Sequence, residues 1–159
     1  MIIVADASPL VSLAILGKLD LLEKLFEDIY IPQAVFNEIT SPDKPFAETL
    51  YDFSTEKIKK VKNKIALSIL TDKLDLGEAE AIILALENNI DRILIDERKG
   101  RKIAETKGLR PIGTIGVLIQ AKEKGIIESV KVFLDELVRN GIYISPKLYE
   151  HVLKLTEET

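Results

Sequence analysis

"IIVADAS", residues 2–8, is an apolar run rich in β-branched residues that ends on a carboxylate, Asp6. A short run of this kind is typical of a strand that is buried on both faces, as the strands of parallel sheets are. A charged side chain at the end of such a strand is costly unless it has a partner. The stretch therefore predicts a central strand at Ile2–Val4 and marks Asp6 as a candidate functional residue.

Apolar strands and amphipathic helices alternate along the rest of the chain, which predicts an α/β fold: a three-layer α/β/α sandwich with a central parallel sheet. We expect a single domain over residues 1–159, with 127–159 as its C-terminal helical part. Further strands are expected at 29–31, 91–96 and 109–114, with a short one in "IKKVK" (58–62). Helices are expected at 8–24 with a break near Gly17, at 32–39, 46–53, 74–89, 98–108 and 115–124, and on both sides of "NGIYISP" (140–146).

The composition excludes several kinds of chemistry. The chain has 159 residues, no cysteine and one histidine, His151, so disulfides, thiolate zinc sites and Ser-His-Asp triads are ruled out. A net charge of -4 argues against a broad nucleic-acid surface but allows local basic patches. No apolar run is long enough to cross a bilayer, and Asp6 interrupts the first one, so we expect a cytoplasmic protein with no membrane association.

Four acidic residues are predicted to meet at one edge of the sheet. Ligands of open parallel sheets bind outside the carboxyl ends of the strands, where Asp6 and Asp96 would both project. Glu38 and Glu78 lie on helices that can face the same edge. Such a cluster repels itself unless it is protonated or bridged by a cation. Oxygen ligands favour Mg²⁺ or Mn²⁺, and such an ion can activate water for phosphodiester hydrolysis.

Five blocks of the sequence resemble the PIN domain, in a prokaryotic branch close to VapC-type toxins. They are "IIVADASPLVSLA", "IYIPQAVFNEI", "LDLGEAEAIILALE", "ILIDERKGRKIAE" and "PIGTIGVLIQAKEKGII". Asp6 and Ser8 fit the D-x-S/T motif of the family, and Pro32, Val35 and Glu38 fit its P-x-x-V-x-x-E helix. The blocks occur in the family's order, with 18 residues from Glu78 to Asp96.

The resemblance implies a metal-dependent endoribonuclease whose metal ligands are Asp6, Glu38, Glu78 and Asp96. It also implies an RNA substrate, a homodimer and a small antitoxin protein that inhibits a toxin of this type. Glu80 is an alternative third acid, although we favour Glu78 because of its spacing from Asp96. The residues that could support the ligands are Ser8, Glu80, Glu97 and Thr114.

Each of these residues also has a purely structural interpretation. Asp6 or Ser8 could cap the helix that follows the first strand, and Ser8 is better explained as a cap than as a nucleophile. Glu38 could be an ordinary surface residue, and Glu78 could stabilise a helix through its dipole. Thr114 could position a metal-bound oxygen or cap the helix that begins at Ile115.

The chain has two basic runs, the first of which lies beside the predicted site. Arg98, Lys99 and Arg101, together with Lys102, could bind phosphate or be a solvated helix start. The run Lys57–Lys64 could guide RNA, but we favour a solvated edge strand, where lysine guards against aggregation. His151 is explained as a helix surface residue.

Three functions remain open at this stage. The favoured one is an endoribonuclease; the alternatives are a PIN-like module that binds RNA or protein without cutting, and a phosphoaspartyl enzyme or receiver. The C-terminal helices at Val130–Val138 and Leu148–Leu155 could supply a dimer face or an antitoxin groove, although packing on the core is favoured.

Overall fold

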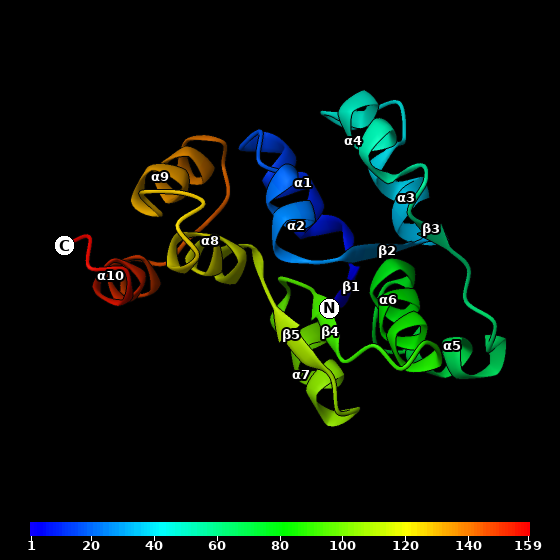
Figure 1. The fold of residues 1–159 in the computed structure, drawn as a ribbon. Coiled ribbons are helices and arrows are strands. Elements are labelled where there is room, and N and C mark those ends of the chain that lie inside the picture. Colours follow the sequence, from blue (N-terminus) through cyan, green and yellow to red (C-terminus); the bar gives the residue numbers. More distant parts are fainter.

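A five-stranded parallel sheet forms the centre of the protein, in the strand order β3-β2-β1-β4-β5 (Figure 1). The structure is a computed structural model that describes all residues, 1–159. The strands are β1 (Ile2–Ala5), β2 (Asp28–Pro32), β3 (Ile58–Lys59), β4 (Arg92–Leu94) and β5 (Arg110–Ile112). The helices are α1 (Ala7–Ile15), α2 (Asp20–Leu25), α3 (Gln33–Ile39), α4 (Ala47–Ser54), α5 (Lys64–Leu70), α6 (Leu76–Glu87), α7 (Arg98–Thr106), α8 (Thr114–Glu123), α9 (Lys131–Arg139) and α10 (Pro146–Leu155).

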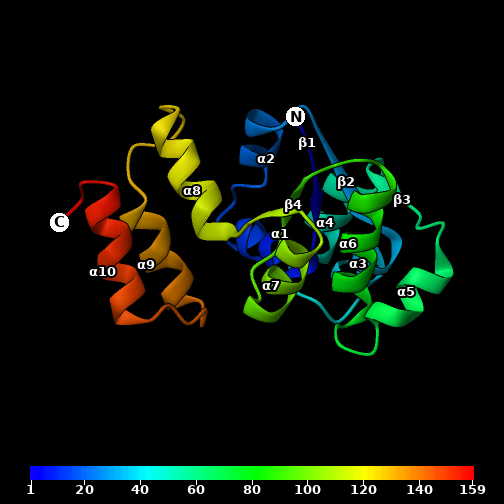
Figure 2. The same cartoon turned by 90° about the horizontal axis from the view of Figure 1, so that it is seen from below.

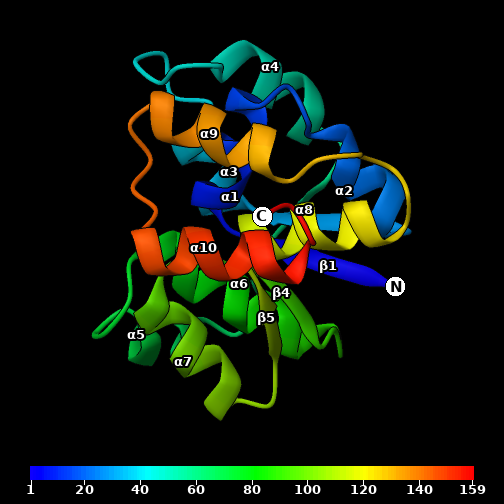
Figure 3. The ribbon, with the colours of Figure 1, turned by 90° about the vertical axis from the view of Figure 1, so that its left-hand side faces the viewer.

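Helices cover both faces of the sheet, as the alternation of the sequence predicts. Successive residues of a strand point to opposite faces. Ile3 and Ala5 of β1 therefore join one core cluster, with α1, α2 and the C-terminal helices, whereas Val4 joins a second cluster with α5, α6 and α7. Figure 3 shows these layers, with α1, α2, α4 and α9 on one side of the strands and α5, α6 and α7 on the other. The predicted three-layer α/β/α fold is confirmed.

The C-terminal helices α8, α9 and α10 group at one side of the molecule (Figure 2). Val130, Leu134 and Val152 belong to the larger core cluster, so this segment packs on the core as the sequence analysis favours. Glu158 fixes its end by accepting hydrogen bonds from the Ser129 hydroxyl at 2.6 Å and from the backbone N–H of Val130 at 2.9 Å. No helix combines the length and the apolar character that a membrane span requires.

Helix α5 is the one element for which the sequence analysis makes no prediction. Asn63 caps it by accepting a hydrogen bond from the Ala66 amide at 3.0 Å. Leu67 and Leu70 are buried, whereas Ile65 and Ile69 are exposed. Because the apolar side chains of this short helix point both to the core and to solvent, the helix lacks the one-sided pattern from which an amphipathic helix is recognised.

The strand order determines where a ligand can bind. The chain runs outward in one direction through β2 and β3, then returns to the other side of β1 to form β4 and β5. In sheets of this kind the crevice lies at the carboxyl ends of the two strands where the order reverses. Here those strands are β1 and β4, which Asp6 and Asp96 follow.

Candidate active site

Asp6 lies at the centre of the site, directly after β1. Its backbone N–H donates to the carbonyl of Leu94 at 2.9 Å, which continues the ladder between β1 and β4. Asp6 occupies the cap position of α1, but its side chain makes no capping hydrogen bond. Burial, partly offset by the Ala7 amide and reinforced by nearby carboxylates, raises the pKa of Asp6 to about 7. The side chain is therefore a buried acid that caps nothing.

Glu38 of α3 approaches Asp6 across a glycine. If Gly77 carried a Cβ, that atom would lie 3.4 Å from Asp6 Oδ1 and 3.5 Å from Glu38 Oε1. It would also lie 3.3 Å from a methyl group of Val35, which is a tight contact. The missing side chain at the start of α6 thus leaves the space in which these two carboxylates face each other. The sequence analysis did not single out Gly77.

Glu78 enters the site from the first turn of α6. Asp75 and Glu78 form a capping box, in which the Glu78 N–H donates to Asp75 Oδ1 at 2.8 Å and the Asp75 N–H donates to Glu78 Oε1 at 3.3 Å. The residue is only 4% exposed, and burial together with Asp75, Glu97 and Asp6 raises its pKa to about 7. Glu78 therefore both caps its helix and takes part in the acid cluster.

Asp75 is a fifth acid near the cluster, and the sequence analysis missed it. Its negative charge contributes to the raised pKa values of both Asp6 and Glu78. The available signal was the D-x-x-E spacing before an apolar run, which is that of a capping box.

Asp96 is held at the opposite side by the start of α8. Thr114 donates from its backbone N–H to Asp96 Oδ1 and from its hydroxyl to Asp96 Oδ2, both at 2.7 Å. A Cβ on Gly113 would lie 2.7 Å from Asp96 Oδ1, so the glycine permits this close approach. Gly113, with no side chain, occupies the cap position of α8. The interpretation of Thr114 as a helix cap is therefore wrong, because its hydroxyl binds Asp96.

Glu80 turns away from the other acids. Its Oε1 accepts a hydrogen bond from the Ala34 amide at 3.0 Å, in the first turn of α3. Glu80 therefore ties α6 to the start of the helix that carries Glu38. Glu97, by contrast, lies near enough to Glu78 to raise its pKa.

Ser8 lies in the first turn of α1, after the cap position, so its interpretation as the helix cap is wrong. It lines a cavity of about 450 Å³, which we call the Lys44 cavity, together with Glu38, Lys44 and Asp96. Lys44 comes from the loop between α3 and α4, and the sequence analysis gave it no role. It lies six residues after Glu38 in the sequence, and the fold brings it to a cavity that Asp96 also lines.

Two of the three predicted phosphate-binding residues border the site. Arg98 and Arg101 line a second cavity with Asp96, of about 580 Å³, which we call the arginine cavity. Lys99 is exposed and does not line it. Arg101 is oriented by a long hydrogen bond of 3.4 Å from its Nη1 to the carbonyl of Ile95.

The run Lys57–Lys64 makes local contacts. Lys57 donates to the carbonyl of Phe53 at 2.7 Å and pairs with Glu23, and Lys59 lies over the ring of Tyr30. These contacts agree with a structural role for the run.

The donor set has the chemistry of a hard-metal site. Asp6, Glu38, Glu78 and Asp96 offer carboxylate oxygens only, as Mg²⁺ and Mn²⁺ prefer. None of the seven ion pairs in the structure involves any of them, so no basic side chain forms a salt bridge with the cluster. As placed, no three or more acidic or histidine side chains lie close enough together to hold a metal ion. Binding an ion would therefore require these carboxylates to draw together.

The fold and the site together define an α/β protein with acidic residues at the switch between β1 and β4. A family model described as a PIN domain matches residues 2–158, so the chain belongs to the PIN domain family. PIN domains are commonly nucleases, and PIN nucleases typically use divalent metal ions and act on RNA or other nucleic acid. No curated protein and no solved structure gives a significant match to the chain.

Proposed function

We propose that this protein is an endoribonuclease that depends on Mg²⁺ or Mn²⁺ and hydrolyses RNA phosphodiester bonds. The observation that carries the proposal is the approach of Asp6, Glu38, Glu78 and Asp96 from four different elements, with no salt bridge to any of them, in a PIN domain. Unpaired acids in a partly buried cluster are unfavourable by themselves, and a divalent cation relieves their repulsion.

These four carboxylates would hold the cation, which supplies activation of water and neutralisation of charge on the phosphodiester. Thr114 fixes both oxygens of Asp96, so this ligand is oriented before anything binds. Arg98 and Arg101, in the arginine cavity, would contact phosphate oxygens beside the cleaved bond. Asp6, buried after β1, would anchor the cation against the sheet.

The test is cleavage of a mixed panel of RNAs by the wild type and by Asp6→Asn, with Mn²⁺, with Mg²⁺ and with excess EDTA. We expect cutting only by the wild type and only with metal. Asp72→Asn is the matched control, because Asp72 is exposed and lies in the turn before α6. Cleavage by Asp6→Asn at the wild-type rate, or undiminished cleavage in EDTA, would contradict the proposal.

A second candidate is a PIN-like module that binds RNA without cutting. The spacing of the carboxylates favours it, because they do not converge closely enough to hold an ion as placed. The same panel distinguishes the two candidates: a binding module retains RNA affinity in EDTA and produces no fragments under any condition.

The resemblance to VapC-type toxins extends the proposal to two protein partners, a second copy of the chain and a small antitoxin. Exposed apolar side chains on the C-terminal helices, Val132 and Val138 on α9 and Leu155 on α10, support a surface that a partner covers. Light scattering over a range of concentrations tests the homodimer, and a strictly monomeric mass would contradict it.

A further inference from the structure

Three cavities adjoin one another across the face that holds the acid cluster. Asp96 lines both the Lys44 cavity and the arginine cavity. Leu148 of α10 lines both the arginine cavity and a third one, of about 530 Å³, which we call the α10 pocket. The shared residues therefore place the three cavities next to one another, from Lys44, past Glu38 and Asp96 and the two arginines, to α10.

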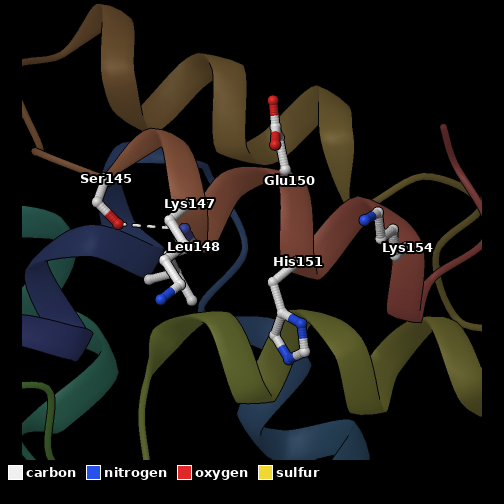
Figure 4. A pocket seen from close by; sticks show the side chains of 6 residues that line it. All are labelled: Ser145, Lys147, Leu148, Glu150, His151 and Lys154. Carbon is white, nitrogen blue, oxygen red and sulfur yellow. Dashed lines mark hydrogen bonds between the residues drawn. The ribbon is translucent and has the colours of Figure 1, made fainter.

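The α10 pocket is basic, in a chain whose net charge is -4. Lys147, His151 and Lys154 line it, and Glu150 is its one acid. Figure 4 shows the Glu150 carboxylate on the opposite side of α10 from the His151 ring. Neither lysine takes part in an ion pair, so both charges are available to a ligand.

The arginines and the lysines line two neighbouring cavities that share Leu148. Arg98 and Arg101 come first, beside Asp96, and the lysines of α10 follow beyond Leu148. At 1.5 Å per residue, Lys147 and Lys154 are about 10 Å apart along the helix axis, which leaves room for more than one phosphate. A row of cations along a single helix matches the one charged backbone of a single strand, whereas a duplex presents two backbones.

We propose that Arg98, Arg101, Lys147 and Lys154 form a track that binds the sugar–phosphate backbone of a single RNA strand and leads it along α10 away from the acid cluster. This inference rests on the proposed function, because it names the form of substrate that the same site receives. It assigns α10 a part in substrate binding, and it predicts that affinity increases with the length of the strand.

The test is RNA binding measured by fluorescence anisotropy, with Asp6→Asn as the parent so that cleavage is suppressed. The probes are labelled single strands of about 4 and about 16 nucleotides, the range of site sizes in single-strand binders. We expect Lys147→Ala/Lys154→Ala to weaken binding of the longer strand at least fivefold and leave the shorter one nearly unchanged. The slope of log affinity against log salt should fall by about 1.4, because two lysines no longer neutralise phosphates of the strand.

Lys107→Ala/Lys124→Ala is the matched control, because both lysines are exposed at helix ends outside the three cavities. The track is disproved if the two double variants bind alike, if the parent binds no strand, or if a duplex of the same length binds more tightly. Cleavage by the otherwise wild-type protein is measured separately. Binding that depends on the lysines without any cleavage would disprove the nuclease alone, and cleavage that is indifferent to the lysines would disprove the track alone.

Discussion

Thr114 is the residue whose contribution to the site can be isolated most cleanly. Its hydroxyl donates to Asp96 Oδ2, and the backbone bond to Oδ1 survives any substitution of the side chain. Thr114→Val keeps the shape but removes a hydrogen bond to a charged group, so one of the two bonds that orient Asp96 is lost. We expect RNA cleavage to fall about 10- to 100-fold, the usual cost of removing a hydrogen bond that orients a metal ligand.

Thr114→Ser is the control for that prediction, because it retains the hydroxyl and should keep cleavage close to the wild-type rate. Melting temperatures of both variants should remain near that of the wild type. Equal rates for Thr114→Val and Thr114→Ser would show that the hydroxyl does not position Asp96 for the reaction.

Asp6 gives a prediction about stability that needs no RNA. In the metal-free protein the pKa of Asp6 is raised from 3.8 to about 7, so the folded chain holds this proton where the unfolded chain has lost it. The free energy of unfolding must therefore fall as the pH rises from about 4 to about 7. Asp6→Asn removes that loss, and should stabilise the metal-free protein above neutral pH by up to about 4 kcal/mol.

The measurement is urea unfolding in EDTA at about pH 5 and about pH 8, for the wild type and Asp6→Asn. The stabilisation by the asparagine should be larger at the higher pH. Asp72→Asn, at an exposed position, should leave the pH dependence unchanged. If the wild type and Asp6→Asn have the same free energy of unfolding at the higher pH, burial of this carboxylate costs little.

At the scale of the element, α6 presents Glu78 and Glu80 to different partners. Glu78 lies near enough to Asp75, Glu97 and Asp6 for their charges to raise its pKa, whereas Glu80 accepts from the Ala34 amide. Glu78→Gln should lower cleavage at least about 100-fold, because a neutral amide is a poor substitute for a carboxylate ligand. Glu80→Gln should keep cleavage within about threefold, because its amide oxygen can still accept from Ala34.

Calorimetric titration with Mn²⁺ accompanies those rates. It should detect weaker binding by Glu78→Gln and unchanged binding by Glu80→Gln. The reverse pattern would make Glu80 the third acid, and would require α6 to present its other face to the cation.

Local sequence signals determined most of the elements but few of their contacts. β1 and β4 were predictable because each is an apolar run followed by an acid, and the sheet order then brings Asp6 and Asp96 to one edge. The hydrogen bond from Thr114 to Asp96 was not predictable, because it depends on how β5 places the start of α8. Helix α5 was missed because its apolar residues do not share one face.

Glu158 connects the end of α10 to the start of α9. Burial opposes its charge, but hydrogen bonds from Ser129 and from the amides of Val130 and Lys131 outweigh that cost and lower the pKa of Glu158. Its stabilising effect is therefore present above the ordinary glutamate pKa and is lost as the pH falls through the lowered one. Glu158→Gln should cost about 1–2 kcal/mol at neutral pH, as expected for losing hydrogen bonds to a charged acceptor.

Urea unfolding at about pH 7 and about pH 3 checks this prediction. The difference in free energy of unfolding between Glu158→Gln and the wild type should be smaller at the lower pH. Glu150→Gln, at an exposed position on α10, is the matched control and should behave as the wild type does at both pH values. If Glu158→Gln loses no more free energy of unfolding at neutral pH than the control does, Glu158 does not stabilise the C-terminal helices.

For the whole molecule, the distribution of charge matters more than its sum. The net charge of -4 argues against broad contact with RNA, yet the acids concentrate at the switch between β1 and β4 and cations line the cavities on either side. Because an acid cluster repels phosphate, a cation that neutralises it should strengthen RNA binding by the cations around it. Binding of metal and binding of RNA should therefore be coupled in this protein.

A metal ion that binds the acid cluster should also stabilise the entire fold. An ion that binds only the native state raises the free energy of unfolding by about 2.7 kcal/mol when its concentration is a hundred times its Kd. For a chain of 159 residues this should raise the melting temperature by roughly 5–10 °C.

Scanning calorimetry measures this rise in melting temperature. We expect it for the wild type with saturating Mn²⁺, with reversal by EDTA, and we expect little change for Asp6→Asn. Asp72→Asn should respond as the wild type does. An equal rise for the wild type and Asp6→Asn would place the bound ion on other carboxylates, and would remove the acid cluster from the proposed mechanism.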